Sequence, residues 1–129
     1  EEFHGTLNNL TCTICGNKIS VDKVDLSADL PSCPKCKGLL KPDFAFYGEG
    51  IPSQVYQNSL ALAEKSDLMI VVGTSGEVMP ACSLPFLVKR NGGKVIEVNT
   101  LPSAYTNVIS DLYFEQKASE FFKELEKLF

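Results

Sequence analysis

Four of the five cysteines fall into two pairs whose spacing suits metal chemistry. Cys12 and Cys15 form one C-x-x-C pair. Cys33 and Cys36 form the second, after a spacer of residues 16–32. Each C-x-x-C turn aims two thiolates at one point, and two such turns complete the tetrahedral shell of Zn²⁺ at about 2.3 Å per Zn–S bond. Four thiolates leave no open coordination position, so the sequence predicts one structural zinc per chain. The alternatives are an iron centre and a redox dithiol site.

His4 is the only histidine in the chain, and the residue type leaves its role open. The four paired cysteines already complete a zinc shell, so His4 is not needed as a ligand. Imidazole titrates near neutral pH, which suits proton transfer in catalysis. A single histidine near a chain end is, however, more often just an exposed side chain. Cys82 lies in an apolar stretch and is expected to be a buried, inert packing residue.

The composition excludes several classes of protein. The chain has 129 residues, of which 44% are hydrophobic and 22% are charged, as in a globular domain or a domain with a small module. A net charge of −4 argues against a nucleic-acid partner, which needs a basic face. No apolar run approaches the roughly 18–20 residues that span a membrane. An odd number of cysteines, four of them in tight pairs, favours a reducing compartment, and we expect a cytoplasmic location.

The chain becomes apolar and regular from about residue 41, after a short lead-in at residues 1–11 and a polar stretch at 12–40. Hydrophobic periodicity predicts three helices, at 53–66, 81–90 and 118–129. It predicts strands at 43–48, 68–72 and 94–99 and a short edge strand at 112–115. The apolar runs at 68–72 and 94–99 are typical of strands buried on both faces, as in a parallel sheet.

Strands that alternate with helices of 10–15 residues indicate βαβ units and therefore an α/β fold with a parallel sheet. A doubly wound fold normally has five or six such strands, and this chain supplies fewer. The expected fold class is a partial Rossmann-like parallel sheet with helices, together with a small zinc-ribbon module. The chain is expected to hold the second half of such a fold.

Several short motifs occur in a specific order along the chain. They are FHG (3–5), the two C-x-x-C pairs, KPDFAFYGE (41–49), GTSGEVMPA (73–81), VIEVN (95–99) and KAS (117–119). In this order they resemble the C-terminal two-thirds of the sirtuins, the Sir2 family of NAD-dependent protein lysine deacylases. The resemblance implies a zinc-binding module at residues 9–40. It also implies that residues 1–8 and 41–129 are the C-terminal part of a Rossmann-like NAD-binding domain whose N-terminal half is absent.

The resemblance assigns roles residue by residue. The histidine of the HG motif is the family's general base, which places that role on His4. The family's four cysteines bind a structural zinc, here Cys12, Cys15, Cys33 and Cys36. An extended segment pairs with the acyl-lysine peptide by strand addition, and it corresponds to Ala45, Phe46, Tyr47, Gly48 and Glu49. The residues that contact the nucleotide correspond to Gly73, Thr74, Ser75, Asn99, Thr100, Leu101 and Ala118.

The implied function is NAD-dependent protein lysine deacylation of the deacetylase type, with transfer of the acyl group to ADP-ribose and release of nicotinamide. NAD⁺ is then the co-substrate, and an acyl-lysine protein or peptide is the partner. The family's glycine-rich first βα turn and its Gln-Asn-x-Asp segment do not occur in these 129 residues. The isolated chain is therefore expected to be inactive. The alternative function is a non-enzymatic zinc-ribbon interaction module on a partial α/β domain.

Overall fold

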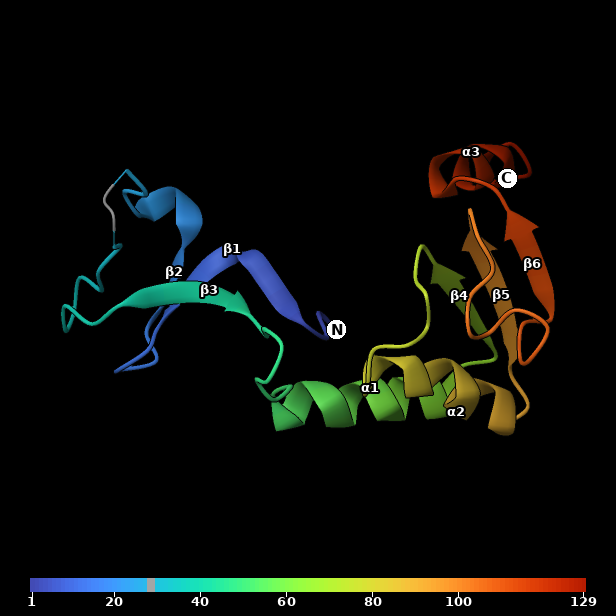
Figure 1. The fold of residues 1–129 in the computed structure, drawn as a ribbon, viewed down its shortest axis with the longest axis horizontal. Coiled ribbons are helices and arrows are strands. Elements are labelled where there is room, and N and C mark those ends of the chain that lie inside the picture. The colour runs from blue at the N-terminus through green and yellow to red at the C-terminus, as the bar shows by residue number, and fades with distance from the viewer. Residues whose placement is uncertain (28–29) are drawn as a thin grey trace. The chain divides into compact units, whose positions relative to one another are not determined.

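The computed structural model describes residues 1–27 and 30–129, which form two compact units, Glu1–Val55 and Tyr56–Phe129 (Figure 1). The first unit contains strands β1 (Gly5–Cys12), β2 (Lys18–Ser20) and β3 (Leu40–Phe44) and a 3-10 turn, η1 (Val21–Lys23). Helix α1 (Ser53–Lys65) begins in the first unit and continues into the second. The second unit continues with β4 (Leu68–Val72), η2 (Ala81–Ser83), α2 (Leu84–Arg90), β5 (Lys94–Asn99), β6 (Leu112–Glu115) and α3 (Ala118–Glu126).

The first unit is an antiparallel sheet in which β1 lies between β2 and β3 (Figure 1). The predicted lead-in at residues 1–11 is wrong, because most of this segment is strand β1. Its sequence, GTLNNLTC, has no apolar alternation, and it is held as a strand by pairing on both edges. The buried core of this unit is small and consists of Leu10, Cys12, Cys33 and Leu40.

The ladder between β1 and β3 is interrupted next to Pro42, and the proline explains the position of the interruption. Thr6 pairs with Asp43, whereas the next pair in the ladder joins Leu10 to Pro42, so residues 7–9 have no partner on β3. Proline has no N–H to donate to a ladder and is confined to edge strands and irregular positions. β3 is an edge strand of this sheet. Such an interruption bends a strand, and it separates the His4–Gly5 end of β1 from the end that leads into Cys12.

The second unit confirms the predicted α/β fold with a parallel sheet. Its strands are ordered β4-β5-β6, and both pairings are parallel. Val71, Val95, Tyr105 and Ile109 form a buried cluster in this unit. β5 is buried as predicted, with Val95, Glu97 and Val98 at 1% exposure or less.

β4 differs from the prediction, because it is not buried on both faces. Leu68, Ile70 and Val72 alternate along one face of β4 and are 50%, 39% and 37% exposed. The physical reason is that little covers this face of the sheet in the described residues: Leu112 on β6, in register with Ile70 through Ile96, is also 54% exposed. The apolar run predicts the strand correctly but not its exposure.

The three predicted helices are present, with small differences at their ends. α2 follows the 3-10 turn η2, and its Pro85 lies in the first helical turn, where a missing N–H costs nothing. α3 ends at Glu126, short of the predicted 129, and Phe129 is fully exposed. Phe121 on α3 packs against Phe114 on β6 with 5.0 Å between ring centroids. None of the helices in the described residues has the length and apolar composition of a membrane-spanning segment.

Candidate functional site

The four paired cysteines converge in the first unit. Their Sγ atoms all lie within 4.8 Å of one another. The Cys12–Cys36 and Cys15–Cys36 Sγ distances are 3.4 Å, and the Cys15–Cys33 distance is 3.8 Å. Tetrahedral Zn–S bonds of about 2.3 Å place neighbouring sulfurs about 3.8 Å apart. The cluster therefore fits a zinc ion bound by four thiolates, two of them buried (Cys12 and Cys33) and two exposed.

The two cysteine turns share one backbone pattern. In the first turn the Gly16 N–H donates to the Cys12 carbonyl at 3.0 Å, and the Cys12 N–H donates to the Asn17 carbonyl at 3.0 Å. In the second, the Lys37 N–H donates to the Cys33 carbonyl at 2.9 Å, and the Cys33 N–H donates to the Gly38 carbonyl at 2.8 Å. The equivalent residues Gly16 and Lys37 both have positive φ, 67° and 63°.

Backbone N–H groups also favour the thiolate forms that bind metal. The pKa of Cys12 is lowered to about 6, first by a hydrogen bond from the Cys15 N–H and then by one from the Ile14 N–H. A hydrogen bond from the Cys36 N–H is the main cause that lowers the pKa of Cys33. Deprotonated cysteine is the form that ligates zinc, so the turns prepare the first cysteine of each pair for the metal.

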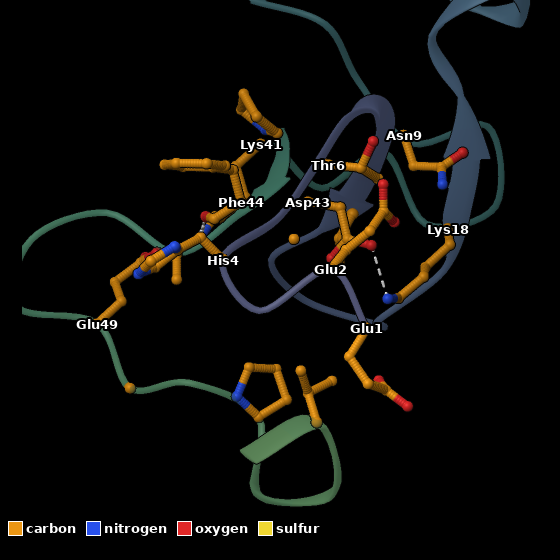
Figure 2. A pocket seen from close by; sticks show the side chains of 17 residues that line it. Glu1, Glu2, His4, Thr6, Asn9, Lys18, Lys41, Asp43, Phe44 and Glu49 are labelled. Atoms are coloured by element: carbon orange, nitrogen blue, oxygen red, sulfur yellow. Dashed lines mark hydrogen bonds and ion pairs between the residues drawn. The ribbon is translucent and has the colours of Figure 1, made fainter. Parts of the chain in front are cut away.

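His4 lines a pocket of about 440 Å³ in the first unit (Figure 2). Ala45 and Glu49 line the same pocket, so the predicted catalytic residue and two of the predicted peptide-binding residues share one cavity. The His4 ring lies between aromatic neighbours, 5.3 Å from the Phe3 centroid and 6.3 Å from that of Phe44. Its backbone is fixed as well, because the Ala45 N–H donates to the His4 carbonyl at 2.9 Å.

The glycine after His4 has a steric reason. Gly5 has φ +83° and pairs with Phe44 in the β1–β3 ladder. A Cβ at this position would lie 2.1 Å from the Asp43 carbonyl oxygen, which no side chain tolerates. The close approach of β3 therefore requires glycine at position 5. The pairing of Gly5 with Phe44 also keeps the neighbouring His4 in the lining of the pocket.

The segment 45–49 is not extended as predicted, because only Asp43 and Phe44 of the predicted 43–48 strand lie in β3. Phe46 begins a turn in which the Glu49 N–H donates to the Phe46 carbonyl at 2.9 Å. The Glu49 carboxylate in turn accepts the Phe46 N–H at 3.0 Å, so this N–H is not available for strand pairing. Phe46 and Tyr47 are 49% and 94% exposed.

Lys41 holds this turn closed. Its Nζ donates to both oxygens of Glu49, at 2.7 and 2.6 Å, and lies 5.3 Å from the centroid of the Phe46 ring. The Lys41 hydrogen bond, followed by that of the Phe46 N–H, lowers the pKa of Glu49 below its ordinary value. A second ion pair in the pocket joins Lys18 to Asp43 at 2.7 Å, drawn as a dashed line in Figure 2.

The predicted nucleotide-contact residues converge in the second unit, at the carboxyl edge of its parallel sheet. Gly73 follows β4, and its N–H donates to the Val98 carbonyl on β5 at 3.1 Å. Asn99 ends β5, and its side-chain amide donates to the Thr74 carbonyl at 2.8 Å. Ala118 begins α3 just after Gln116, whose N–H donates to the Asn99 carbonyl at 3.1 Å. Parallel α/β sheets bind ligands at this edge.

The side chains at this edge suit a polar ligand. Thr74, Ser75, Thr100 and Leu101 are exposed, so three hydroxyls and one apolar side chain face solvent at this edge. The Asn99 Oδ1 accepts the Thr100 N–H at 3.0 Å, which fixes the orientation of the amide. Hydroxyl and amide groups are the donors and acceptors that recognise a ribose. His4 and the segment 45–49 belong to the first unit, whereas these residues belong to the second.

Two features of the second unit differ from what the sequence suggests. Cys82 packs against the buried cluster of this unit, as expected, but it is half-buried instead of buried, and its Sγ lies 3.1 Å from the Met79 sulfur. Glu97 is 1% exposed and was not predicted to have a role. The available signal is a single charged residue inside the apolar strand VIEVN, followed by hydroxyl residues at 103, 106 and 110.

Comparison with protein-family models gives a match over residues 1–80, to the model described as the Sir2 family. Among curated proteins, the NAD-dependent protein deacylase of Pyrococcus furiosus is 41% identical over 129 residues, covering 96% of this chain and 51% of the relative. That of Aquifex aeolicus is 40% identical over 124 residues, covering 96% of this chain and 52% of the relative. The chain thus spans about half the length of the curated relatives it matches.

Solved structures agree with these matches. The crystal structure of a Sir2 homolog–NAD complex has a TM-score of 0.91 at 38% identity, covering 98% of this chain and 49% of that chain. Sir2 bound to acetylated peptide has a TM-score of 0.90 at 32% identity, covering 98% of this chain and 54% of that chain.

Proposed function

The chain belongs to the Sir2 family, and from that premise we propose that it provides the general base, the structural zinc site and part of the NAD site of an NAD-dependent protein lysine deacylase. The observation that carries the proposal is the convergence at the carboxyl edge of one parallel sheet. Gly73–Ser75, Asn99–Leu101 and Ala118 come from three separate segments and meet where such sheets bind ligands.

The division of the chain that we propose follows from these sites. Residues 9–40 are the zinc-binding module, and residues 1–8 and 41–129 belong to the Rossmann-like domain that binds NAD. Cys12, Cys15, Cys33 and Cys36 hold one zinc ion, whose chemical contribution is structural because four thiolates close its shell. All five cysteines are free, which supports a reducing, cytoplasmic location.

NAD⁺ supplies the ADP-ribose that receives the acyl group, with nicotinamide as the leaving group. The exposed hydroxyls of Thr74 and Ser75 and the amide of Asn99 bind the adenosine ribose, and Ala118 contacts the adenine. The imidazole of His4 accepts a proton from a ribose hydroxyl, which is the role of a general base.

The acyl-lysine peptide is proposed to bind along residues 45–49. The Phe46 N–H is occupied by the Glu49 carboxylate, so the peptide pairs with other backbone groups of this segment. The Lys41–Glu49 ion pair holds the turn in one shape before the peptide arrives, and Phe46 and Tyr47 offer exposed aromatic surface beside it. Ala45 and Glu49 line the same pocket as His4, which supports binding of the acyl-lysine beside the general base.

The test uses a protein in which this chain follows the glycine-rich turn and the Gln-Asn-x-Asp segment of its family, here called the completed protein. We expect nicotinamide release from NAD⁺ and an acetyl-lysine peptide. His4→Ala lowers kcat about a hundredfold or more, as expected for loss of a general base. The matched control is Glu126→Gln, at an exposed position of α3, which keeps full activity.

The same experiment separates the two candidate functions. Activity that depends on NAD⁺ and on His4 supports the deacylase. A completed protein that binds zinc but neither binds nor consumes NAD⁺ supports the zinc-ribbon interaction module. The 129-residue chain alone is expected to release no nicotinamide at a useful rate, and robust release from it would contradict the proposed need for the two upstream segments.

A further inference from the structure

Glu97 on β5 is a buried carboxylate held by hydroxyl groups. The side chain is 1% exposed. Its Oε1 accepts a hydrogen bond from Ser103 Oγ, and its Oε2 accepts one from Ser110 Oγ at 2.7 Å. Thr106 Oγ1 lies 2.9 Å from both carboxylate oxygens. A buried carboxylate is costly unless its oxygens are fully hydrogen-bonded, so this cluster requires a physical explanation.

The hydroxyls of this cluster also hold the backbone of the loop that carries them. Ser103 Oγ accepts the Tyr105 N–H at 3.1 Å, and Thr106 Oγ1 accepts the Ser103 N–H at 2.9 Å. A carboxylate accepts only, so each hydroxyl must point its hydrogen at Glu97 and its lone pairs at the loop. Glu97 thereby fixes the direction of two hydroxyls, and these fix the shape of residues 103–106.

The loop that Glu97 shapes is bonded to the proposed nucleotide site. The Ala104 N–H donates to the Ser75 carbonyl at 2.9 Å. Tyr105 is 2% exposed, and its Oη donates to the Cys82 carbonyl at 3.1 Å, which fixes the loop from its other side. Asn99 lies two residues after Glu97 on β5 and bonds to the Thr74 carbonyl. The Gly73–Ser75 loop is therefore held at three points. Val98 bonds to Gly73, Asn99 bonds to Thr74, and Ala104, in the loop that Glu97 shapes, bonds to Ser75.

We propose that Glu97 is a positioning residue of the nucleotide site, which holds residues 100–110 in the shape that presents Ser75 and Asn99–Leu101 to the adenosine half of NAD⁺. The inference rests on the proposed function. It goes beyond that function because Glu97 itself is buried and contacts no nucleotide. Its effect is specific to NAD⁺, since no residue of its cluster belongs to the first unit, where His4 and the peptide segment lie.

The decisive substitution is Glu97→Gln in the completed protein. Glutamine has the same shape but replaces one acceptor oxygen with a donor NH₂, so one or more hydroxyls of the cluster must reverse and release the loop backbone. Loss of one hydrogen bond to a charged group raises KM for NAD⁺ about tenfold. KM for the acetyl-peptide stays within about twofold of the unsubstituted protein, as expected for a site that leaves the peptide segment untouched.

Two further variants complete the experiment, a matched control and a milder change in the same cluster. Glu64→Gln, at an exposed position of α1, changes neither KM. If Glu97→Gln does not fold, Ser110→Ala tests the inference in its place. This variant removes one hydrogen-bond donor to Glu97 and retains Ser103 and Thr106. It is expected to raise KM for NAD⁺, and not KM for the peptide, by a smaller factor than Glu97→Gln.

Three outcomes overturn the inference. An active completed protein in which Glu97→Gln changes neither KM shows that the cluster does not position the nucleotide site. An equal rise in both KM values, with a lower melting temperature, shows a general structural role. If the unsubstituted completed protein releases no nicotinamide, the proposed function itself fails, and this inference fails with it.

Discussion

The two units of this chain satisfy buried anionic groups in different ways. In the first unit, four cysteines surround a point beside a core of only Leu10, Leu40 and two of the cysteines themselves. In the second, the Glu97 carboxylate is surrounded by hydroxyls of the chain itself. Clustered thiolates repel one another without a cation, whereas hydroxyls satisfy a carboxylate without any external ion. We therefore expect the first unit, but not the second, to need a metal ion in order to fold.

Loss of zinc is expected to have the largest effect on stability and to act on the first unit alone. Cys33→Ser removes a fully buried ligand and with it most of the metal affinity, and structural zinc contributes on the order of 10 kcal/mol to folding. We expect about one zinc per native chain by elemental analysis and none in the variant. Amide hydrogen exchange should show lost protection in residues 1–55 and retained protection in 56–129. Cys82→Ser is the control, and a zinc-free native sample would contradict the prediction.

Glu97→Ala is expected to have the next largest effect, in the second unit only. The three hydroxyls lose their common acceptor inside the protein, which costs about 3 kcal/mol of unfolding free energy. Hydrogen exchange should show faster opening of residues 100–110 and unchanged zinc content. A variant as stable as the original chain would show that water or a new hydrogen bond replaces the carboxylate.

Asp111 makes the second unit sensitive to acid. A hydrogen bond from Lys89, followed by one from the Val95 N–H, holds the pKa of Asp111 well below its ordinary value of 3.8. A lowered pKa in the folded state means that the stabilisation is complete above pH 3.8 and is lost as the pH falls below it. Asp111→Asn should be less stable than the original chain at neutral pH and should lose less stability on acidification. Asp67→Asn, at an exposed position, is the control, and the measurement is urea unfolding at several pH values.

The smallest effect on stability is expected from substitutions at the two equivalent positive-φ positions of the cysteine turns. Gly16 and Lys37 occupy equivalent positions with positive φ, a conformation that costs a non-glycine residue about 1 kcal/mol. Lys37→Gly should therefore stabilise the zinc-loaded first unit by about that amount, and Gly16→Ala should destabilise it similarly. Thermal unfolding of the zinc-loaded protein measures both. Equal melting temperatures for the chain and its Lys37→Gly variant would show that the side chain of Lys37 compensates for its backbone strain.

Local sequence signals were sufficient for much of the fold. The zinc ligands follow from spacing alone, since each C-x-x-C closes its own turn. The helices and the strands β4 to β6 follow from apolar periodicity, and the parallel sheet follows from their alternation. The family resemblance places the proposed nucleotide-contact residues after β4, after β5 and at the start of α3, and the parallel register brings these segments to one edge.

The remaining features depend on contacts between residues far apart in the chain. β1 has no apolar alternation, and its strand conformation comes from pairing with β2 and β3. In sequence, residues 46–49 look like a continuation of the preceding strand. In the structure they form a turn, because the Glu49 carboxylate pairs with Lys41 and accepts the Phe46 N–H. The exposure of one face of β4 depends on which elements pack on that face of the sheet. Glu97 stands out in sequence as a charged residue inside an apolar strand, but its role is not predicted, because its hydroxyl partners come from a loop that has no pattern of its own.

The shared pattern of the two cysteine turns has a consequence for how this family of sequences can vary. Each turn is closed by hydrogen bonds within six consecutive residues, Cys12–Asn17 and Cys33–Gly38. In the stretch between the turns, β2 pairs with β1, Ile19 and Val24 pack on the core, and Ser32 bridges to Leu39. Residues 25–27 are exposed and lie outside these contacts. Lengthening a loop costs little, about 0.6 kcal/mol for each doubling. We therefore expect insertions or grafted loops at 25–27 to leave the geometry of the cysteine cluster unchanged.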